Sequence, residues 1–169
     1  MFALIFGLSF LANAQDVQKD QPKGYQFTDI KRLPATSVKD QARAGTCWSW
    51  SGISFFESEM IRMGKEPIDL SAMYIVRHAY SDKATKFVRL HGNMNFAVGG
   101  AFCDVMHVIK NYGIVPMDVY KGLNYGEPNH AFGEIDDVLA GYVNAVIKNS
   151  NKKLSTAWKK GFDGILDAY

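Results

Sequence analysis

The residues best suited to covalent chemistry lie in one stretch, Gln41 to Trp50, which reads Gln-Ala-Arg-Ala-Gly-Thr-Cys-Trp-Ser-Trp. Its single thiol, Cys47, stands at the start of a run of helical periodicity. A thiol in the first turn of a helix faces unpaired N–H groups and the positive end of the helix dipole, which favour thiolate over thiol. Cys47 is therefore the predicted nucleophile of a covalent reaction.

Acyl transfer also requires hydrogen-bond donors at the position where the oxyanion forms. Gln41 lies six residues before Cys47, so its side-chain amide and the Cys47 backbone N–H are the predicted donors. Gly45 allows the loop to turn back tightly and a substrate backbone to approach. Trp48 and Trp50 are predicted to anchor the stretch in the core. This combination favours a thiol acyl-transfer site.

The elements that would position this stretch are helices, because apolar residues recur at steps of three and four. Helices are predicted from Cys47 to Met63, Ser71 to Tyr80, Gly99 to Gly113, Ile135 to Asn149 and Ser155 to Tyr169. The apolar face of the third is predicted to hold Phe102, Val105, Met106, Ile109 and Tyr112. The segments 83–95 and 119–133 are polar or rich in Gly and Pro and are predicted to be irregular.

Three further motifs follow the nucleophile stretch in order: Asp69-Leu70-Ser71, Val98-Gly99-Gly100 and Tyr112-Gly113-Ile114-Val115-Pro116. Together with Gln-x5-Cys-Trp and a Gly two residues before the Cys, they resemble the papain-like cysteine peptidases. The resemblance implies an α+β papain-like fold, of which this chain covers mainly the helical left domain. It also implies a peptide substrate, no metal and no organic cofactor.

The resemblance assigns roles to individual residues. Cys47 attacks the peptide carbonyl, and Gln41 with the Cys47 N–H holds the oxyanion. The backbone of Gly99 and Gly100 pairs with an extended substrate, and Trp48 shapes the site. The catalytic His and Asn come from a β-barrel-like C-terminal half that is absent from this chain.

One departure points to a branch of the family. Ala44 stands three residues before the nucleophile, where many relatives carry a Cys, and this favours the bleomycin hydrolase and aminopeptidase C-like group. That branch implies an aminopeptidase-like activity and an oligomeric assembly. Val98 occupies a position where Asn or Asp commonly precedes the Gly pair.

The four histidines are His78, His91, His107 and His130, and none has a family motif around it. His107 falls on the polar face of the third helix, so we expect it to be solvated, and the other three are expected to have surface or structural roles. Cys103, which also lacks the nucleophile signature, is predicted to be a buried, unreactive thiol.

Two alternatives remain open from the sequence. A transglutaminase-like acyl transferase also places Gly-x-Cys-Trp at a helix start, although it leaves Gln41 and the Gly99-Gly100 segment without a role. A non-catalytic papain-fold binding module would need no histidine. The acyl transferase differs from a peptidase in the reaction that it catalyses, whereas the binding module catalyses no reaction.

The composition of the chain bears on its partners, and its N-terminal residues bear on its domain organisation and its cellular compartment. Nineteen basic and seventeen acidic residues form no basic stripe, which argues against nucleic acid as a partner. Residues 1–14 end in Ala-Asn-Ala and are a predicted signal peptide, too short to span a membrane, with no basic residue before the apolar run. Residues 15–24 form a predicted flexible lead-in, and residues 25–169 a partial peptidase domain. The protein is expected to be exported, to the periplasm or outside the cell.

Overall fold

Hydrophobic periodicity places most of the helices of this chain correctly. The computed structural model describes residues 24–25, 27–151 and 153–169, so the predicted signal peptide and residues 15–23 of the lead-in lie outside it. The chain divides into two units, Met1–Arg32 and Leu33–Tyr169, and the second holds the helices. They are α1 (Cys47–Arg62), α2 (Ala72–Arg89), α3 (Phe102–Tyr112), α4 (Gly133–Ile147) and α5 (Ala157–Ala168).

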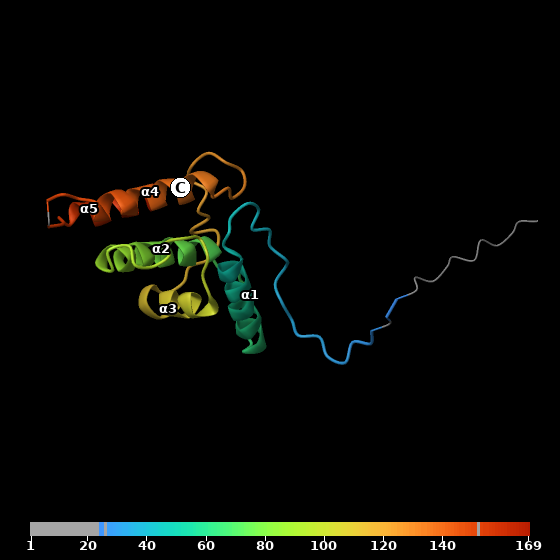
Figure 1. Cartoon of the computed structure of the whole chain (residues 1–169). Helices are drawn as coiled ribbons and strands as arrows, with labels where there is room; N and C mark the ends of the chain where they lie inside the picture. The colour runs from blue at the N-terminus through green and yellow to red at the C-terminus, as the bar shows by residue number, and fades with distance from the viewer. Residues whose placement is uncertain (1–23, 26, 152) are drawn as a thin grey trace, which may run out of the picture. The chain divides into compact units, whose positions relative to one another are not determined.

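The second helix, α2, is the central element of the unit. It packs against each of the other four helices, and Figure 1 shows it between α3 on one side and α4 with α5 on the other. Ser71 caps the N-terminus of α2, because its hydroxyl accepts a hydrogen bond of 2.9 Å from the Tyr74 N–H. The core therefore forms on both sides of one helix.

The predicted end of α2 at Tyr80 is wrong, since the helix continues to Arg89. Ala84, Phe87 and Val88 are buried and prolong the apolar stripe, while the charged side chains between them made the segment look irregular. The helix needs this length to pack against α3 and α5.

The apolar face predicted for α3 is also wrong in part. Val105 and Val108 are fully buried, whereas Phe102, Met106 and Tyr112 are exposed. The reason lies at the crossing with α1, where a Cβ on Gly52 would be only 2.8 Å from Val105 Cγ2. The close approach turns the smaller valines inward.

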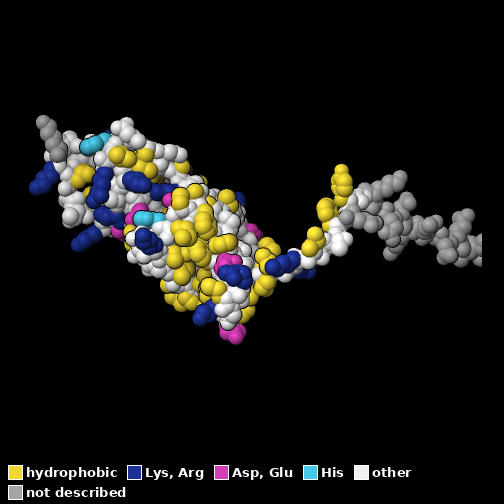
Figure 2. All heavy atoms as spheres, turned by 90° about the horizontal axis from the view of Figure 1, so that it is seen from below, with side chains coloured by type: hydrophobic (Ala, Val, Ile, Leu, Met, Phe, Trp, Pro, Cys, Tyr) yellow, Lys and Arg dark blue, Asp and Glu magenta, His cyan; other side chains and the backbone are white. Residues whose placement is uncertain are grey.

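This rotation leaves an apolar face on α1 and α3. Phe55 lies with its ring centroid 5.5 Å from that of Phe102, and Phe56 lies 5.8 Å from Phe102. Figure 2 shows hydrophobic side chains gathered on the face seen from below. None of the helices in the described ranges is long and apolar enough to cross a membrane.

Strand-like structure is sparse in the described part of the chain. Two isolated bridges pair Arg43 with Ala131 and Leu70 with Pro116, and no longer ladder occurs among these residues. Tyr25, Phe27, Ile30 and Leu33 alternate with polar residues along the chain, but they form no strand and are exposed. The helical content is consistent with the helical left domain of a papain-like fold.

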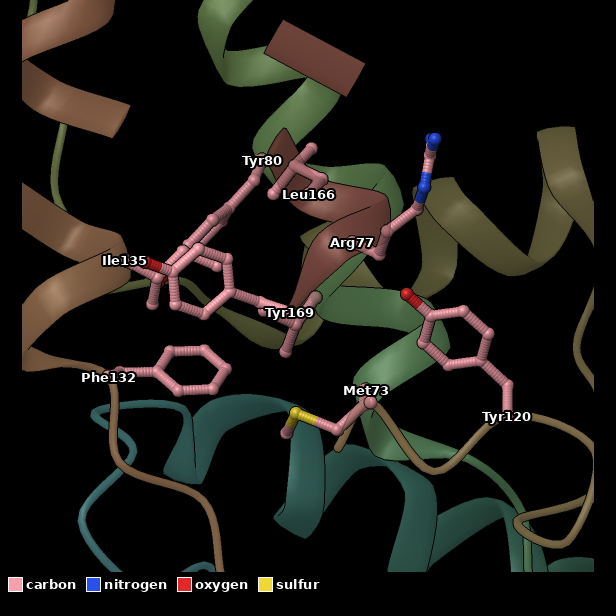
Figure 3. Close-up of a pocket in the computed structure, with 10 residues that line it drawn as sticks. Met73, Arg77, Tyr80, Tyr120, Phe132, Ile135, Leu166 and Tyr169 are labelled. Carbon is pink, nitrogen blue, oxygen red and sulfur yellow. The ribbon is translucent and has the colours of Figure 1, made fainter. Parts of the chain in front are cut away.

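A small cavity lies between α2, α4 and α5, and Figure 3 shows the side chains around it. Its volume of about 20 Å³ accommodates no more than one water molecule. Tyr80 and Phe132 line it with their ring centroids 6.5 Å apart. No residue of the 41–50 stretch lines this cavity. The cavity is therefore a feature of the core and not of the candidate active site.

The loop before Cys47 is attached to α1 through a buried carboxylate, Glu57. Its side chain is fully buried and accepts hydrogen bonds from the Thr36 hydroxyl, the Lys39 ammonium at 2.6 Å and the Leu70 N–H at 2.7 Å. Burial acts to lower the pKa of Lys39, but hydrogen bonds and charge from Glu57 and Asp69 outweigh it and hold the pKa above its ordinary value. Lys39 therefore stays protonated at neutral pH.

We expect Glu57→Ala to lower the free energy of unfolding by about 3 kcal/mol, because it orphans the buried Leu70 N–H and removes the partner of Lys39. Urea denaturation monitored by circular dichroism measures the change. Glu59→Ala is the matched control on the same helix, since Glu59 pairs with Arg62 at an exposed position and should change stability little. Equal effects of the two substitutions would contradict the anchoring role of Glu57.

Candidate active site

The loop that precedes the helix folds back on itself at Gln41. The Ala44 N–H donates to the Gln41 carbonyl at 3.2 Å, and the Gln41 side-chain Nε2 donates to the Ala44 carbonyl at 2.8 Å. Ala42 between them has φ of 50°, a left-handed conformation, and its N–H is bound by the Asp40 carboxylate at 2.7 Å. Backbone strain of this kind is concentrated at functional loops.

Cys47 is the first residue of α1, as predicted, and its side chain is exposed. The first turn of α1 contains no acidic residue, so no nearby carboxylate opposes the positive end of the helix dipole. The Cys47 N–H has no acceptor among the described residues. An exposed thiol and a free backbone donor thus occupy the same residue.

The Gln41 amide is half-buried at the entrance to this helix. One of its two N–H bonds is used on the Ala44 carbonyl, and within the described residues the other has no acceptor. The arrangement fixes the plane of the amide while leaving a donor available. Its role as an oxyanion donor stays a prediction.

Trp48 connects the nucleophile to the Gly99-Gly100 segment. Its indole Nε1 donates to the Val98 carbonyl at 3.0 Å, across 50 residues of sequence, and a Cβ on Gly100 would overlap the indole ring. On the other side, a Cβ on Gly45 would lie 2.7 Å from Val98 Cγ2. Glycine is therefore required at both positions for the loop and the segment to approach this closely.

The structure thus brings together the residues that the sequence singled out. Gly99 and Gly100 are exposed, and the Gly99 and Gly100 N–H groups and the Gly100 carbonyl make no hydrogen bond within the described part of the chain. An exposed thiol at a helix start, with free backbone groups on the segment that Trp48 holds beside it, fits attack on a peptide.

A comparison with protein families supports the same conclusion. The model of the papain family cysteine proteases matches residues 22–159, most of the chain. The chain belongs to the papain family of cysteine proteases. A search of curated proteins finds no match. The matched range includes the nucleophile stretch and the Gly pair, and membership of the papain family makes the chain a hydrolase of the cysteine peptidase class.

No histidine among the described residues of this papain-family chain forms a hydrogen bond with Cys47. His107 is exposed, as predicted, and its Nε2 lies 3.2 Å from Asp82 Oδ2. His78 stacks on Tyr112 with ring centroids 4.3 Å apart, and His91 is exposed just beyond the end of α2. These three have surface or structural settings.

The fourth histidine, His130, lies behind the nucleophile loop. It is buried, its carbonyl accepts from the Arg43 N–H at 2.9 Å, and its ring lies 5.7 Å from that of Trp50. Burial lowers the pKa of His130, and its Nδ1 has no hydrogen-bond partner among the residues that the structure describes. His130 is a neutral packing residue in the support of the loop.

Two features of the site were missed or misjudged from the sequence. Cys103 is exposed rather than buried, because α3 turns Val105 and Val108 to the core and leaves Cys103 on its open side. Lys83 donates to the carbonyls of Ala97 and Gly99, and a single lysine in a helix gives no sequence signal for such contacts.

We expect Cys47 to react with iodoacetamide about threefold or more faster than Cys103 in the folded protein. Both thiols are exposed near helix starts, but Asp104 adds a negative charge in the first turn of α3. Peptide mapping by mass spectrometry gives the two rates in one sample.

Cys103→Ser provides the control, since it should leave the rate at Cys47 unchanged. Equal rates, or faster modification of Cys103, would remove the chemical distinction on which the choice of Cys47 as nucleophile depends.

Proposed function

We propose that Cys47 attacks the carbonyl of a peptide bond and that the Cys47 N–H and the Gln41 amide stabilise the resulting oxyanion. The observation that carries the proposal is that both donors lack an acceptor at the start of α1, within the described residues, while the thiol is exposed. Preorganised donors of this kind are the largest single contribution in many acyl-transfer enzymes.

The substrate backbone is proposed to pair with the Gly99-Gly100 segment. Its unpaired N–H and carbonyl groups match the donor and acceptor pattern of an extended peptide. The absence of a side chain at Gly99, where a Cβ would meet nothing within 4 Å, leaves open space above the segment. Peptides would therefore be recognised there through their backbone.

The general base is proposed to be a histidine, oriented by an asparagine, from a β-barrel-like half outside these residues. The support is that no histidine in the described part of the chain is placed to exchange a proton with Cys47. With that half the whole would be the α+β papain-like fold. Proton transfer to the leaving amine requires such a base.

We further propose the bleomycin hydrolase and aminopeptidase C-like branch, with aminopeptidase-like action, an oligomeric assembly and export through residues 1–14. Ala44 supports the branch, because this position is buried and carries no thiol, and both cysteines are free. A non-catalytic peptide-binding module is the second candidate, favoured by the absence of a histidine beside Cys47 within the described residues.

The purified chain should not hydrolyse fluorogenic aminopeptidase or endopeptidase substrates above a Cys47→Ala blank. Loss of the catalytic histidine costs about 10⁶ in kcat in the serine protease subtilisin, which would put turnover at the assay floor. Robust turnover that disappears in Cys47→Ala would show that a histidine of this chain is the base. Single substitutions at the four histidines would then identify it.

A peptide nitrophenyl ester separates a peptidase site from a binding module. The thiolate attacks the ester carbonyl, a thioester forms, and nitrophenolate leaves without needing a proton. Intact-mass spectrometry should show one acyl group per chain, located on Cys47. A pure binding module would leave Cys47 unmodified.

A further inference from the structure

The segment that leads into the Gly pair and includes Gly99 is held by side chains rather than by a β-sheet. Residues 95–100 belong to no strand or helix, yet three consecutive carbonyls are each bound by a helix side chain. Lys83 of α2 donates to the carbonyls of Ala97, at 3.4 Å, and Gly99. Trp48 of α1 donates to the Val98 carbonyl between them, at 3.0 Å.

Lys83 also contacts the ring that lies under the Gly pair. Its Nζ lies 5.5 Å from the ring centroid of Trp48 and 5.5 Å from that of Tyr80, within the range of a cation–π interaction. One ammonium therefore joins α2, the Trp48 indole next to the nucleophile and the Gly99 carbonyl.

Packing alone does not explain why the charged ammonium of Lys83 lies at this partly buried position. Burial lowers the pKa of Lys83, with the charge of Asp104 acting in the opposite direction, and no carboxylate among the described residues forms an ion pair with it. A partly buried charge without an anionic partner is unfavourable unless other groups compensate. Here the carbonyls and the aromatic faces provide the compensation.

We propose that Lys83 is a positioning residue that presets the Gly99-Gly100 segment for pairing with the backbone of a peptide substrate. The inference rests on the proposed peptide-binding role of that segment. Fixing the backbone of a loop residue costs conformational entropy. Because Lys83 and Trp48 fix this backbone during folding, the cost does not reduce the affinity for peptide. Lys83 uses the Gly99 carbonyl and leaves the Gly99 and Gly100 N–H groups unpaired.

The test is the concentration dependence of Cys47 labelling by a peptidyl epoxide, which separates peptide affinity (KI) from the rate of bond formation (kinact). The epoxide is opened by the thiolate, which forms a C–S bond, and the resulting alkoxide is protonated by solvent. Lys83→Met should raise KI by about tenfold, with kinact and the iodoacetamide rate at Cys47 within about twofold of the parent chain. Lys83→Arg should restore most of the affinity, because a guanidinium also donates to two carbonyls.

The control is Lys86→Met, which removes an exposed lysine from the same helix and should leave KI unchanged. If Lys83→Met does not fold, Lys83→Gln provides the second variant, with the same expected rise in KI. An unchanged KI in folded Lys83→Met or Lys83→Gln, or a parallel loss of the iodoacetamide rate, would overturn the positioning role. Labelling of the parent chain that does not saturate would instead overturn the proposed peptide site, and the Lys83 inference with it.

Discussion

The carboxylate of Glu57 is the interaction on which the geometry of the site depends. It is fully buried, and it binds the segment that leads to the nucleophile loop, through Thr36 and Lys39, to the middle of α1 and to the Leu70 N–H before α2. A buried charge is tolerated only where several donors satisfy it. Because the donors come from segments far apart in sequence, satisfying Glu57 fixes where the loop enters the helix.

The chain that follows the segment held by Glu57 leads through the nucleophile loop to Cys47 and Trp48. The loop returns through the reciprocal hydrogen bonds of Gln41 and Ala44, and Cys47 then begins α1 with its N–H unpaired among the described residues. Trp48, one residue later, donates a hydrogen bond to the Val98 carbonyl and so fixes the segment before the Gly pair relative to the start of α1. Cys47, the proposed oxyanion donors and the Gly99-Gly100 backbone are therefore positioned by contacts around one helix start.

The sequence predicted the parts of this site that depend on local pattern. Periodicity placed Cys47 at a helix start, and the resemblance to the papain-like peptidases implied that Gly99 and Gly100 belong to the same site, because each signal is contained within a few residues. The inward face of α3 was mispredicted, since it depends on the close crossing of Gly52 and Val105. The end of α2 was mispredicted because charged side chains separate the buried residues Ala84, Phe87 and Val88. The contacts of Lys83 were not predicted, because they join separate elements and therefore leave no local pattern in the sequence.

The central claim is that Cys47 adds to a peptide carbonyl within an oxyanion site formed by its own N–H and Gln41. A peptide aldehyde carrying ¹³C at the carbonyl tests it directly, because addition of the thiol converts the trigonal carbon into a tetrahedral hemithioacetal with a distinct resonance. We expect this resonance with the parent chain and with Cys103→Ser, a weaker signal with Gln41→Ala, and none with Cys47→Ser. A hemithioacetal that survives Cys47→Ser, or no hemithioacetal with the parent chain, would contradict it.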